Sequence, residues 1–205
     1  MTAVDNVVAA IRAGEPVVLP FDTVYGLAAD PSREESARRL YRLKGRDETK
    51  PSALLARDVD YLLECVPELR GRPATIARAL LPGAFTLVFA NPARRFRWLT
   101  GPTPDAIGVR VPDLSGPTAD VLARVGAVVA TSANHPGGQD PASLNDVPRE
   151  LVDGAAAALD GGTLDGTPST VIDFTGSKPR VLRAGAANPG KALERVAALV
   201  AGTQA

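Results

Sequence analysis

Short apolar runs alternate with amphipathic segments along almost the whole of this chain. The run Ala127-Val128-Val129-Ala130 has no polar side chain, which is typical of a strand buried on both faces of a sheet. Further strands are predicted at 16–20, 52–56, 85–89, 106–111, 156–159, 169–174 and 179–182. Helices are predicted at 3–13, 32–43, 58–66, 73–81, 114–125, 144–152 and 189–199. This alternation predicts an α/β fold with an open, twisted, mixed β-sheet flanked by helices.

Two local patterns give sharper expectations near the N-terminus. Residues 21–27 contain Asp and Thr directly after the first strand, and we expect them to form a polar turn. Ser32 is followed three residues later by Glu35, which is the pattern of a capping box, so the next helix is expected to begin there.

The size, charge and cysteine content of the chain limit the classes of protein to which it can belong. Its 205 residues, 45% of them hydrophobic, suffice for one core, and no linker or repeat divides them, so we predict a single domain over 1–205. Because 23 Lys and Arg balance 23 Asp and Glu, no net charge draws the chain to nucleic acid or membrane. Cys65 is the single cysteine, which excludes an internal disulfide. With no signal-like start and no run of 18 apolar residues, we expect a cytoplasmic protein without a membrane partner.

A basic stretch at the end of the second helix is the first candidate site. Lys44, Arg46 and Lys50 surround Gly45, which lets the backbone turn, and Pro51 prevents further helix. Arg and Lys together suit phosphoryl oxygens, so the stretch is interpreted as a clamp for a triphosphate in a solvated cleft. The alternative is a solvated basic helix end that is favoured by the helix dipole.

The loop after the buried strand is the second candidate. Thr131, Ser132 and Asn134 leave the strand directly, so hydroxyls, an amide and backbone N–H groups can converge on a nucleotide phosphate. A turn in which Ser132 and Asn134 satisfy their own backbone is equally compatible with the sequence.

Arg110 lies near the end of a strand with apolar neighbours, and a buried arginine needs an anion. That anion is either a carboxylate of the protein or the carboxylate of a substrate. Thr23 and Tyr25, with Asp22, supply polar groups beside the first strand, although Asp-Thr is also ordinary turn chemistry.

Seven segments, in this order and spacing, resemble the YrdC/Sua5 family over residues 7–186. They are PFDTVYGLAAD at 20–30, LKGRDETKP at 43–51, LPGAFTLVF at 81–89, IGVRVP at 107–112, TSAN at 131–134, STVIDF at 169–174 and VLRAG at 181–185. The resemblance implies a short, single-domain threonylcarbamoyl-AMP synthase, which makes threonylcarbamoyladenylate and pyrophosphate from L-threonine, bicarbonate and ATP. A downstream threonylcarbamoyl transferase would then use the product for the t6A modification of tRNA at position 37.

The resemblance also implies roles for residues of this chain. The catalytic residues, which hold the nucleotide phosphates, would be Lys44, Arg46, Ser132 and Asn134. Lys50, Thr131 and Arg183 would also lie by the nucleotide, and threonine and its carbamate would contact Thr23, Tyr25, Arg110 and Ser169. Catalysis would rest on charge neutralisation and in-line positioning, with Mg²⁺ carried by ATP and no metal ligand from a side chain.

One departure from the family and two alternatives stay open. Phe21 stands where the family has a threonine that contributes to amino-acid binding, so the preference for L-threonine is the least constrained part of the assignment. One alternative is a protein that binds double-stranded RNA, or tRNA, through a basic patch of Arg70, Arg72, Arg94, Arg95 and Arg97. The other is a YciO-like paralogue without this activity.

Overall fold

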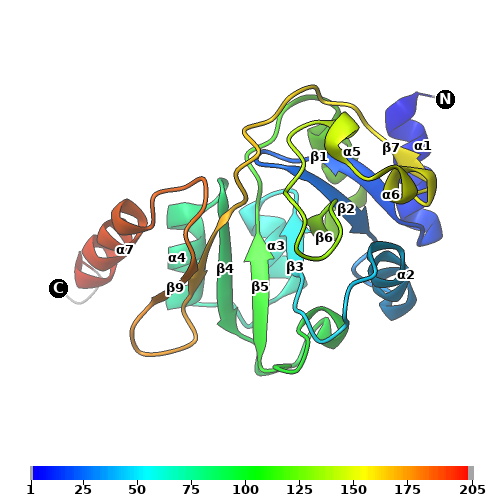
Figure 1. The fold of residues 1–205 in the computed structure, drawn as a ribbon. Helices are drawn as coiled ribbons and strands as arrows, with labels where there is room; N and C mark the ends of the chain where they lie inside the picture. The colour runs from blue at the N-terminus through cyan, green and yellow to red at the C-terminus, as the bar shows by residue number, and fades with distance from the viewer. Residues whose placement is uncertain (1, 203–205) are drawn as a thin grey trace.

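The computed structural model describes residues 2–202, which form a mixed α/β structure (Figure 1). The helices are α1 (Ala3–Ala13), α2 (Glu34–Lys44), α3 (Val59–Cys65), α4 (Arg72–Leu80), α5 (Gly116–Val125), α6 (Arg149–Asp153) and α7 (Pro189–Gly202), with short 3₁₀ helices at Arg97–Leu99 and Leu144–Asp146. The strands are β1 (Val17–Pro20), β2 (Tyr25–Ala29), β3 (Ala53–Ala56), β4 (Phe85–Ala90), β5 (Ala106–Arg110), β6 (Ala127–Ser132), β7 (Ala157–Ala158), β8 (Thr170–Asp173) and β9 (Arg180–Arg183).

All nine of these strands belong to one sheet, in the order β7-β1-β2-β6-β3-β5-β4-β8-β9. The pairs β1–β7, β3–β5 and β4–β8 are parallel, and the other neighbours are antiparallel. The predicted open, mixed sheet is therefore confirmed. The single domain over 1–205 stays a prediction.

The polar turn predicted for residues 21–27 is wrong in its second half, because Tyr25–Ala29 is strand β2. All five residues are buried, and β2 pairs with β1 on one side and with β6 on the other. Its sequence, Tyr-Gly-Leu-Ala-Ala, has no β-branched residue, so local propensity is weak. The two neighbouring strands supply the hydrogen bonds that the sequence pattern does not reveal.

The capping box predicted at Ser32 is also wrong. Helix α2 begins at Glu34 with Arg33 at the cap position, and no side chain caps it. Ser32 instead donates from its backbone and hydroxyl to Asp30 Oδ1, at 2.8 and 2.6 Å. A nearer carboxylate therefore competes successfully for the serine hydroxyl.

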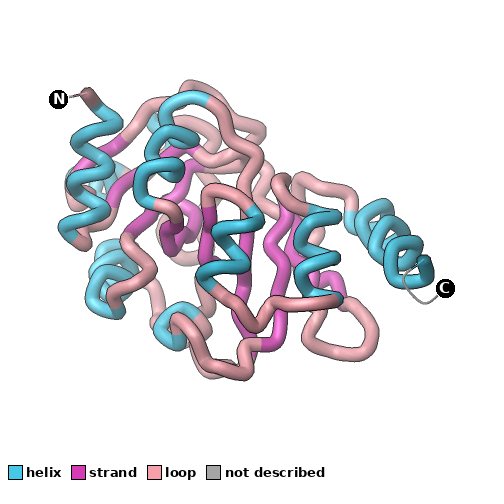
Figure 2. Tube along the Cα trace, turned by 180° about the vertical axis from the view of Figure 1, so that it is seen from behind, coloured by secondary structure: helices cyan, strands magenta, loops and turns pink. Residues whose placement is uncertain are grey.

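The two faces of the central strands have different environments. Leu54, Leu87, Ile107, Val109 and Val129 point into a core that includes residues of α3 and α4. Figure 1 shows β4 and β5 in front of these helices, and Figure 2, seen from behind, shows helices crossing in front of the strands. No helix within residues 2–202 lies over the opposite face of β3, β4 and β5 (Figure 1).

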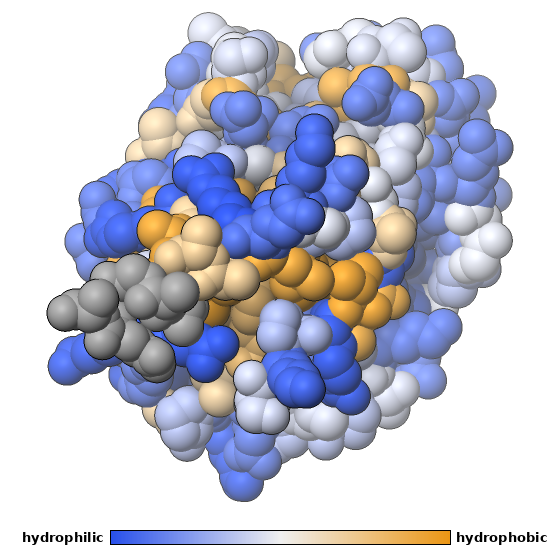
Figure 3. Space-filling view, turned by 90° about the vertical axis from the view of Figure 1, so that its left-hand side faces the viewer, coloured by the Kyte–Doolittle hydropathy of each residue, from blue (hydrophilic) through white to orange (hydrophobic). Residues whose placement is uncertain are grey.

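The α7 end of the molecule exposes an apolar band, which Figure 3 shows in orange between polar surroundings. The exposed large hydrophobic residues of the described chain are Val181 and Leu182 on β9 and Leu199 on α7. No helix within residues 2–202 combines the length and the apolar character that a membrane crossing needs.

Candidate functional site

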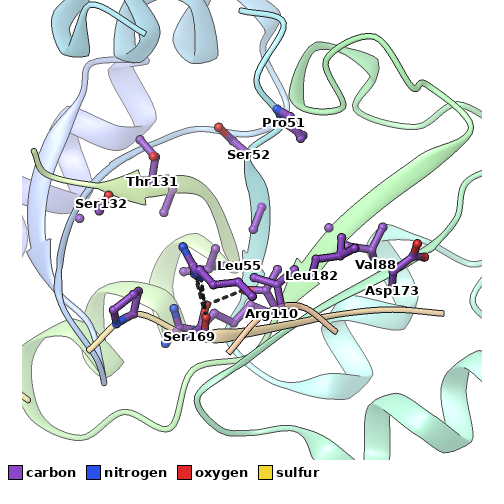
Figure 4. Close-up of a pocket in the computed structure, with 18 of the residues that line it drawn as sticks. Pro51, Ser52, Leu55, Val88, Arg110, Thr131, Ser132, Ser169, Asp173 and Leu182 are labelled. Atoms are coloured by element: carbon purple, nitrogen blue, oxygen red, sulfur yellow. Dashed lines mark hydrogen bonds between the residues drawn. The ribbon is translucent and has the colours of Figure 1, made fainter. Parts of the chain in front are cut away.

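A cavity of about 540 Å³ lies on the open face of the sheet (Figure 4). Alternate residues of four neighbouring strands form its floor, because side chains two apart share a face. These residues are Ala53 and Leu55 of β3, Thr86 and Val88 of β4, Ala106, Gly108 and Arg110 of β5, and Ala130 and Ser132 of β6. The floor is thus mostly small or apolar, and the polar groups lie at its ends.

Lys44 lies behind one end of the cavity, where α2 meets the end of β6. Neither Lys44 nor Asn134 is among the residues that line the cavity, whereas Thr131 and Ser132, which Lys44 contacts, are. The Lys44 ammonium donates to Thr131 Oγ1 at 3.1 Å, to Asn134 Oδ1 at 3.0 Å, and to the carbonyl and hydroxyl oxygens of Ser132. The Ser132 hydroxyl donates in turn to Asn134 Oδ1 at 2.7 Å. The helix end and the strand-end loop, which the sequence placed in separate candidate sites, therefore form one cluster.

The expectation that Lys44 lies in a solvated cleft is wrong, because the residue is only 2% exposed. The pKa of Lys44 is lowered to about 8, chiefly by burial and also by the positive charges of Arg46 and Lys50, while Asp140 acts in the opposite direction. Its direct partners are neutral oxygens. At neutral pH the site therefore holds a buried positive charge without a carboxylate in direct contact.

Arg46 lies at the mouth of the same end and is half-buried. It donates from Nη2 to the carbonyl of Pro51 at 2.7 Å, and its buried Nε has no hydrogen-bond partner in the part of the chain that the structure describes. Burial lowers the pKa of its guanidinium. Lys50 is exposed, and its ammonium has no hydrogen bond or ion pair with the described residues. Arg46 thus presents unused donors to the cavity, and Lys50 contributes charge from outside.

Arg110 occupies the other polar region, and the structure decides between its two proposed anions. Its Nη2 forms an ion pair with Asp22 and donates to Thr23 Oγ1 at 3.0 Å. The second oxygen of Asp22 accepts from the backbone N–H of Asp113 at 3.0 Å. A protein carboxylate therefore already faces the guanidinium, whose buried Nε lacks a partner among the described residues. Burial lowers the pKa of Arg110, and Asp22 opposes that shift.

Ser169 and Arg183 complete this region. The Arg183 guanidinium donates to the carbonyl of Ser169 at 2.8 Å and to its hydroxyl at 3.2 Å, and the same hydroxyl lies 2.9 Å from Thr86 Oγ1. Figure 4 shows Arg110 and Ser169 close together, with Thr131 and Ser132 across the cavity. The charge of Arg183 also lowers the pKa of Arg110, so the residue expected beside the nucleotide lies near the expected amino-acid group.

Tyr25 is not part of the cavity lining. Its hydroxyl donates towards the carbonyl of Gly162 (2.8 Å) and Asp160 Oδ1 (3.1 Å) and accepts from the N–H of Gly161. Thr23, 1% exposed, reaches the site only through Arg110. Neither Tyr25 nor Thr23 is among the residues that line the cavity, and each side chain is hydrogen-bonded to an internal partner.

Three acidic residues of the site were missed from sequence. Asp22 was considered as a polar group beside the first strand or as a turn residue, but not as the partner of Arg110, and Asp140 and Asp173 were not considered as site residues. Asp140 and Asp173 line the cavity, and Asp173 accepts from Thr175 and from Arg180 at 2.6 Å. Carboxylates are not expected to line a site for an anion, because like charges repel, so no sequence pattern pointed to Asp140 or Asp173.

The basic patch predicted for RNA is partly neutralised. Arg94 pairs with Asp105 at 2.9 Å, and Arg95 pairs with Glu68 at 2.7 Å. Arg70 donates to the carbonyl of Pro67. Two of the five arginines thus carry a counter-charge, and RNA binding stays a prediction.

Comparison with known proteins gives concordant results. The family model Sua5/YciO/YrdC, described as "Telomere recombination", matches residues 9–185. The chain is 35% identical over 202 residues to a threonylcarbamoyl-AMP synthase of Bos taurus, covering 94% of this chain and 70% of that protein. Among solved structures it matches Pyrococcus abyssi Sua5 complexed with L-threonine (TM-score 0.85, 29% identity, 94% of this chain) and Escherichia coli YciO (TM-score 0.79, 25% identity, 93% of this chain and 92% of YciO). The chain spans 56% of the length of the Sua5 chain.

Proposed function

Since this chain belongs to the Sua5/YciO/YrdC family, we propose that it is an L-threonylcarbamoyl-AMP synthase. It would use L-threonine, bicarbonate and ATP, and its product would pass to a threonylcarbamoyl transferase for t6A synthesis in tRNA. The observation that carries the proposal is the pair Thr131 and Ser132 at one end of a cavity that has Arg110 at the other, with the buried Lys44 ammonium bonded to both from behind. A site of this kind suits a substrate with a polyanionic end and a carboxylate.

The chemistry requires two anions to meet. The amino nitrogen of threonine adds to CO₂ and loses a proton, which gives a carbamate. A carbamate oxygen then bonds to the α-phosphorus, the bond from that phosphorus to the bridging oxygen breaks, and pyrophosphate leaves. The residues' task is to offset negative charge and align the reacting atoms, and no covalent intermediate with the protein is required.

Each end of the cavity would serve one reactant. Lys44 and Arg46, with the Ser132 hydroxyl, would hold the phosphates, because their donors converge there without a carboxylate in direct contact. Arg110 and Ser169 would orient the threonine carboxylate and the carbamate. The small residues between them, such as Gly108, let the two substrates approach over the floor of the sheet.

Mg²⁺ would enter with the triphosphate. Within residues 2–202 no three His, Cys, Asp or Glu side chains gather as a metal site, and the cavity carboxylates Asp140 and Asp173 are engaged by hydrogen bonds. This donor set fits an ion held by phosphate oxygens and water rather than by a protein cage. When bound, the ion would offset the charge of the leaving pyrophosphate.

Phe21 forms part of the apolar wall beside the amino-acid region. It is 4% exposed, and its ring packs so closely on Gly26 that a Cβ there would lie 2.8 Å from the ring. The wall offers no side-chain hydrogen bond at this position. We propose that Arg110 and Ser169 suffice for L-threonine, which the related Pyrococcus abyssi Sua5 binds.

The test is pyrophosphate release from ATP and bicarbonate across a panel of amino acids that includes threonine, serine and valine. We expect release that depends on threonine. Release that depends on another amino acid would mean that the protein catalyses the same type of reaction on a different amino-acid substrate. No release with any amino acid, although ATP binds, would contradict the proposal and favour a YciO-like role.

A further inference from the structure

The loop that follows β6 is fixed at both ends by the backbone of a single residue. The N–H of Ala133 donates to the carbonyl of Tyr25, and the N–H of Tyr25 donates to the carbonyl of Pro141, both at 2.9 Å. Between these points the N–H of Gly138 donates to the carbonyl of His135. Asp140, immediately before Pro141, is therefore held in place by the central sheet.

This placement brings Asp140 against the amide of Asn134, which is 8% exposed. Asn134 Nδ2 donates to the carbonyl of Gly138 at 2.7 Å and to Asp140 Oδ1 at 3.3 Å. With its NH₂ group turned to these two acceptors, the amide presents Oδ1 to Lys44 and Ser132. Asp140 thus contributes to the orientation that makes Asn134 an acceptor for the buried ammonium.

Asp140 also affects the protonation of Lys44 through its charge. Arg46 and Lys50 are the neighbouring cations, and both disfavour the protonated ammonium, as burial does. Asp140 is the acidic group that acts in the opposite direction. The buried cation therefore has a counter-charge that it reaches across Asn134 rather than by direct contact, and this carboxylate itself lines the cavity.

We propose that Asp140 is a positioning residue of the phosphate-binding end, which orients the Asn134 amide and supports the positive charge of Lys44 from across that amide. The inference rests on the proposed function for the identity of the polyanion. It runs against the simple expectation that a carboxylate lining an anion cavity repels the ligand. If Asp140 supports the charge of Lys44, removal of the carboxylate should weaken triphosphate binding at high pH. If Asp140 only repels the ligand, its removal should strengthen binding.

Three variants separate the effects. Asp140→Asn keeps the shape but removes the charge, Asp140→Ala removes charge and hydrogen bond, and Asp140→Glu keeps the charge. Asp120→Asn, an exposed position on α5, is the matched control. Binding of inorganic triphosphate is measured by calorimetry over about pH 6 to 9, where Lys44 titrates. Thermal unfolding establishes that each variant is folded.

For Asp140→Asn we expect the loss of triphosphate binding at high pH to begin at a lower pH than in the unchanged protein. For Asp140→Ala we expect, in addition, binding about three- to tenfold weaker at the acid end of the range, because the amide is no longer held. Asp140→Glu should restore the pH profile at least in part, and Asp120→Asn should leave it unchanged. If Asp140→Ala does not fold, the Asn and Glu variants still decide the charge effect.

Tighter binding in Asp140→Asn at every pH would show that Asp140 only repels the ligand and would overturn the inference. Identical profiles for Asp140→Asn, Asp140→Ala and the unchanged protein would overturn it as well. Because triphosphate binding needs no turnover, these results can be read even if the protein releases no pyrophosphate from any amino acid. Failure of the proposed function and failure of this inference are therefore distinguishable.

Discussion

The two polar ends of the cavity treat their buried cations differently. Lys44 is surrounded by the oxygens of Thr131, Ser132 and Asn134, all neutral, whereas Arg110 forms an ion pair with Asp22. Both cations are almost fully buried, so both carry a desolvation cost. Lys44 keeps a charge that no carboxylate contacts directly, whereas the charge of Arg110 is already paired and Arg183 is the remaining cation near it. A polyanion should therefore gain more at the first end, while the second end is better suited to fixing geometry.

Substitution of Asp22 should have the largest effect, because Arg110, like Lys44, would then have no carboxylate in direct contact. For Asp22→Ala we expect the free energy of unfolding to fall by about 3 to 5 kcal/mol, the usual cost of breaking a buried ion pair. Denaturant unfolding measures this. The control is Asp105→Ala, which breaks the exposed pair with Arg94 and should cost no more than about 1 kcal/mol. Equal costs for the two variants would show that the Arg110 pair is not a special feature of the site.

Replacing Lys44 by a neutral side chain of similar length removes the buried positive charge of the first end. For Lys44→Met we expect pyrophosphate release to fall about 100-fold or more, as when a donor to a developing charge is lost. The steady-state rate with saturating ATP is the measurement, and Lys178→Met, an exposed lysine, is the control. A folded Lys44→Met variant with normal turnover would exclude this end as the phosphate site.

The buried ammonium also predicts an unusual pH dependence of stability. The pKa of Lys44 is about 8 in the folded protein and near 10.5 when unfolded, so between these values the unfolded chain binds more protons. The free energy of unfolding should therefore rise from about pH 8 to about pH 10.5, with a Lys44 contribution of up to about 3 kcal/mol. Below pH 8 the cost of the buried charge is fully present. Denaturant unfolding of the unchanged protein and of Lys44→Met at both pH values isolates the effect. Parallel pH curves for the two proteins would contradict it.

The smallest expected effect concerns the mouth of the same end. For Arg46→Gln we expect the KM for ATP to rise about tenfold with little change in stability, since among the described residues its side chain donates a hydrogen bond only to the Pro51 carbonyl. Arg72→Gln, at an exposed arginine of α4, serves as the control. A change in KM for threonine but not for ATP would place the phosphates elsewhere in the cavity.

The fold was predictable where burial and periodicity coincide. The run at 127–130 became the buried strand β6, and the helix 3–13 was found at Ala3–Ala13. Strand β2 was not predictable from local pattern, because Gly26, Ala28 and Ala29 have weak strand propensity and are ordered by their neighbours.

Individual residues of the candidate site were predictable from the sequence, but the hydrogen bonds and ion pairs between them were not. Lys44 and Asn134 were recognisable as polar residues at element ends, yet their hydrogen bond joins positions 90 apart in the chain. The partner of Arg110 is 88 residues away, and nothing in the local sequence around Asp22 distinguishes an ion pair from a turn. Pairings over such separations are set by the order of the strands, which composition and periodicity do not determine.

That strand order also fixes a length. In the sheet, β3 alone separates β6, which carries Ser132, from β5, which carries Arg110. Two strand spacings correspond to about 10 Å across the sheet, and the backbone hydrogen bonds keep this spacing constant. The register adds a displacement along the strands, because Arg110 and Val128 both pair with Leu55 and Ser132 lies four residues beyond Val128. Loop insertions around the cavity would change its rim but not this width. A ligand that reaches both Ser132 and Arg110 must therefore span a separation that is set by the backbone geometry of the sheet rather than by any side chain.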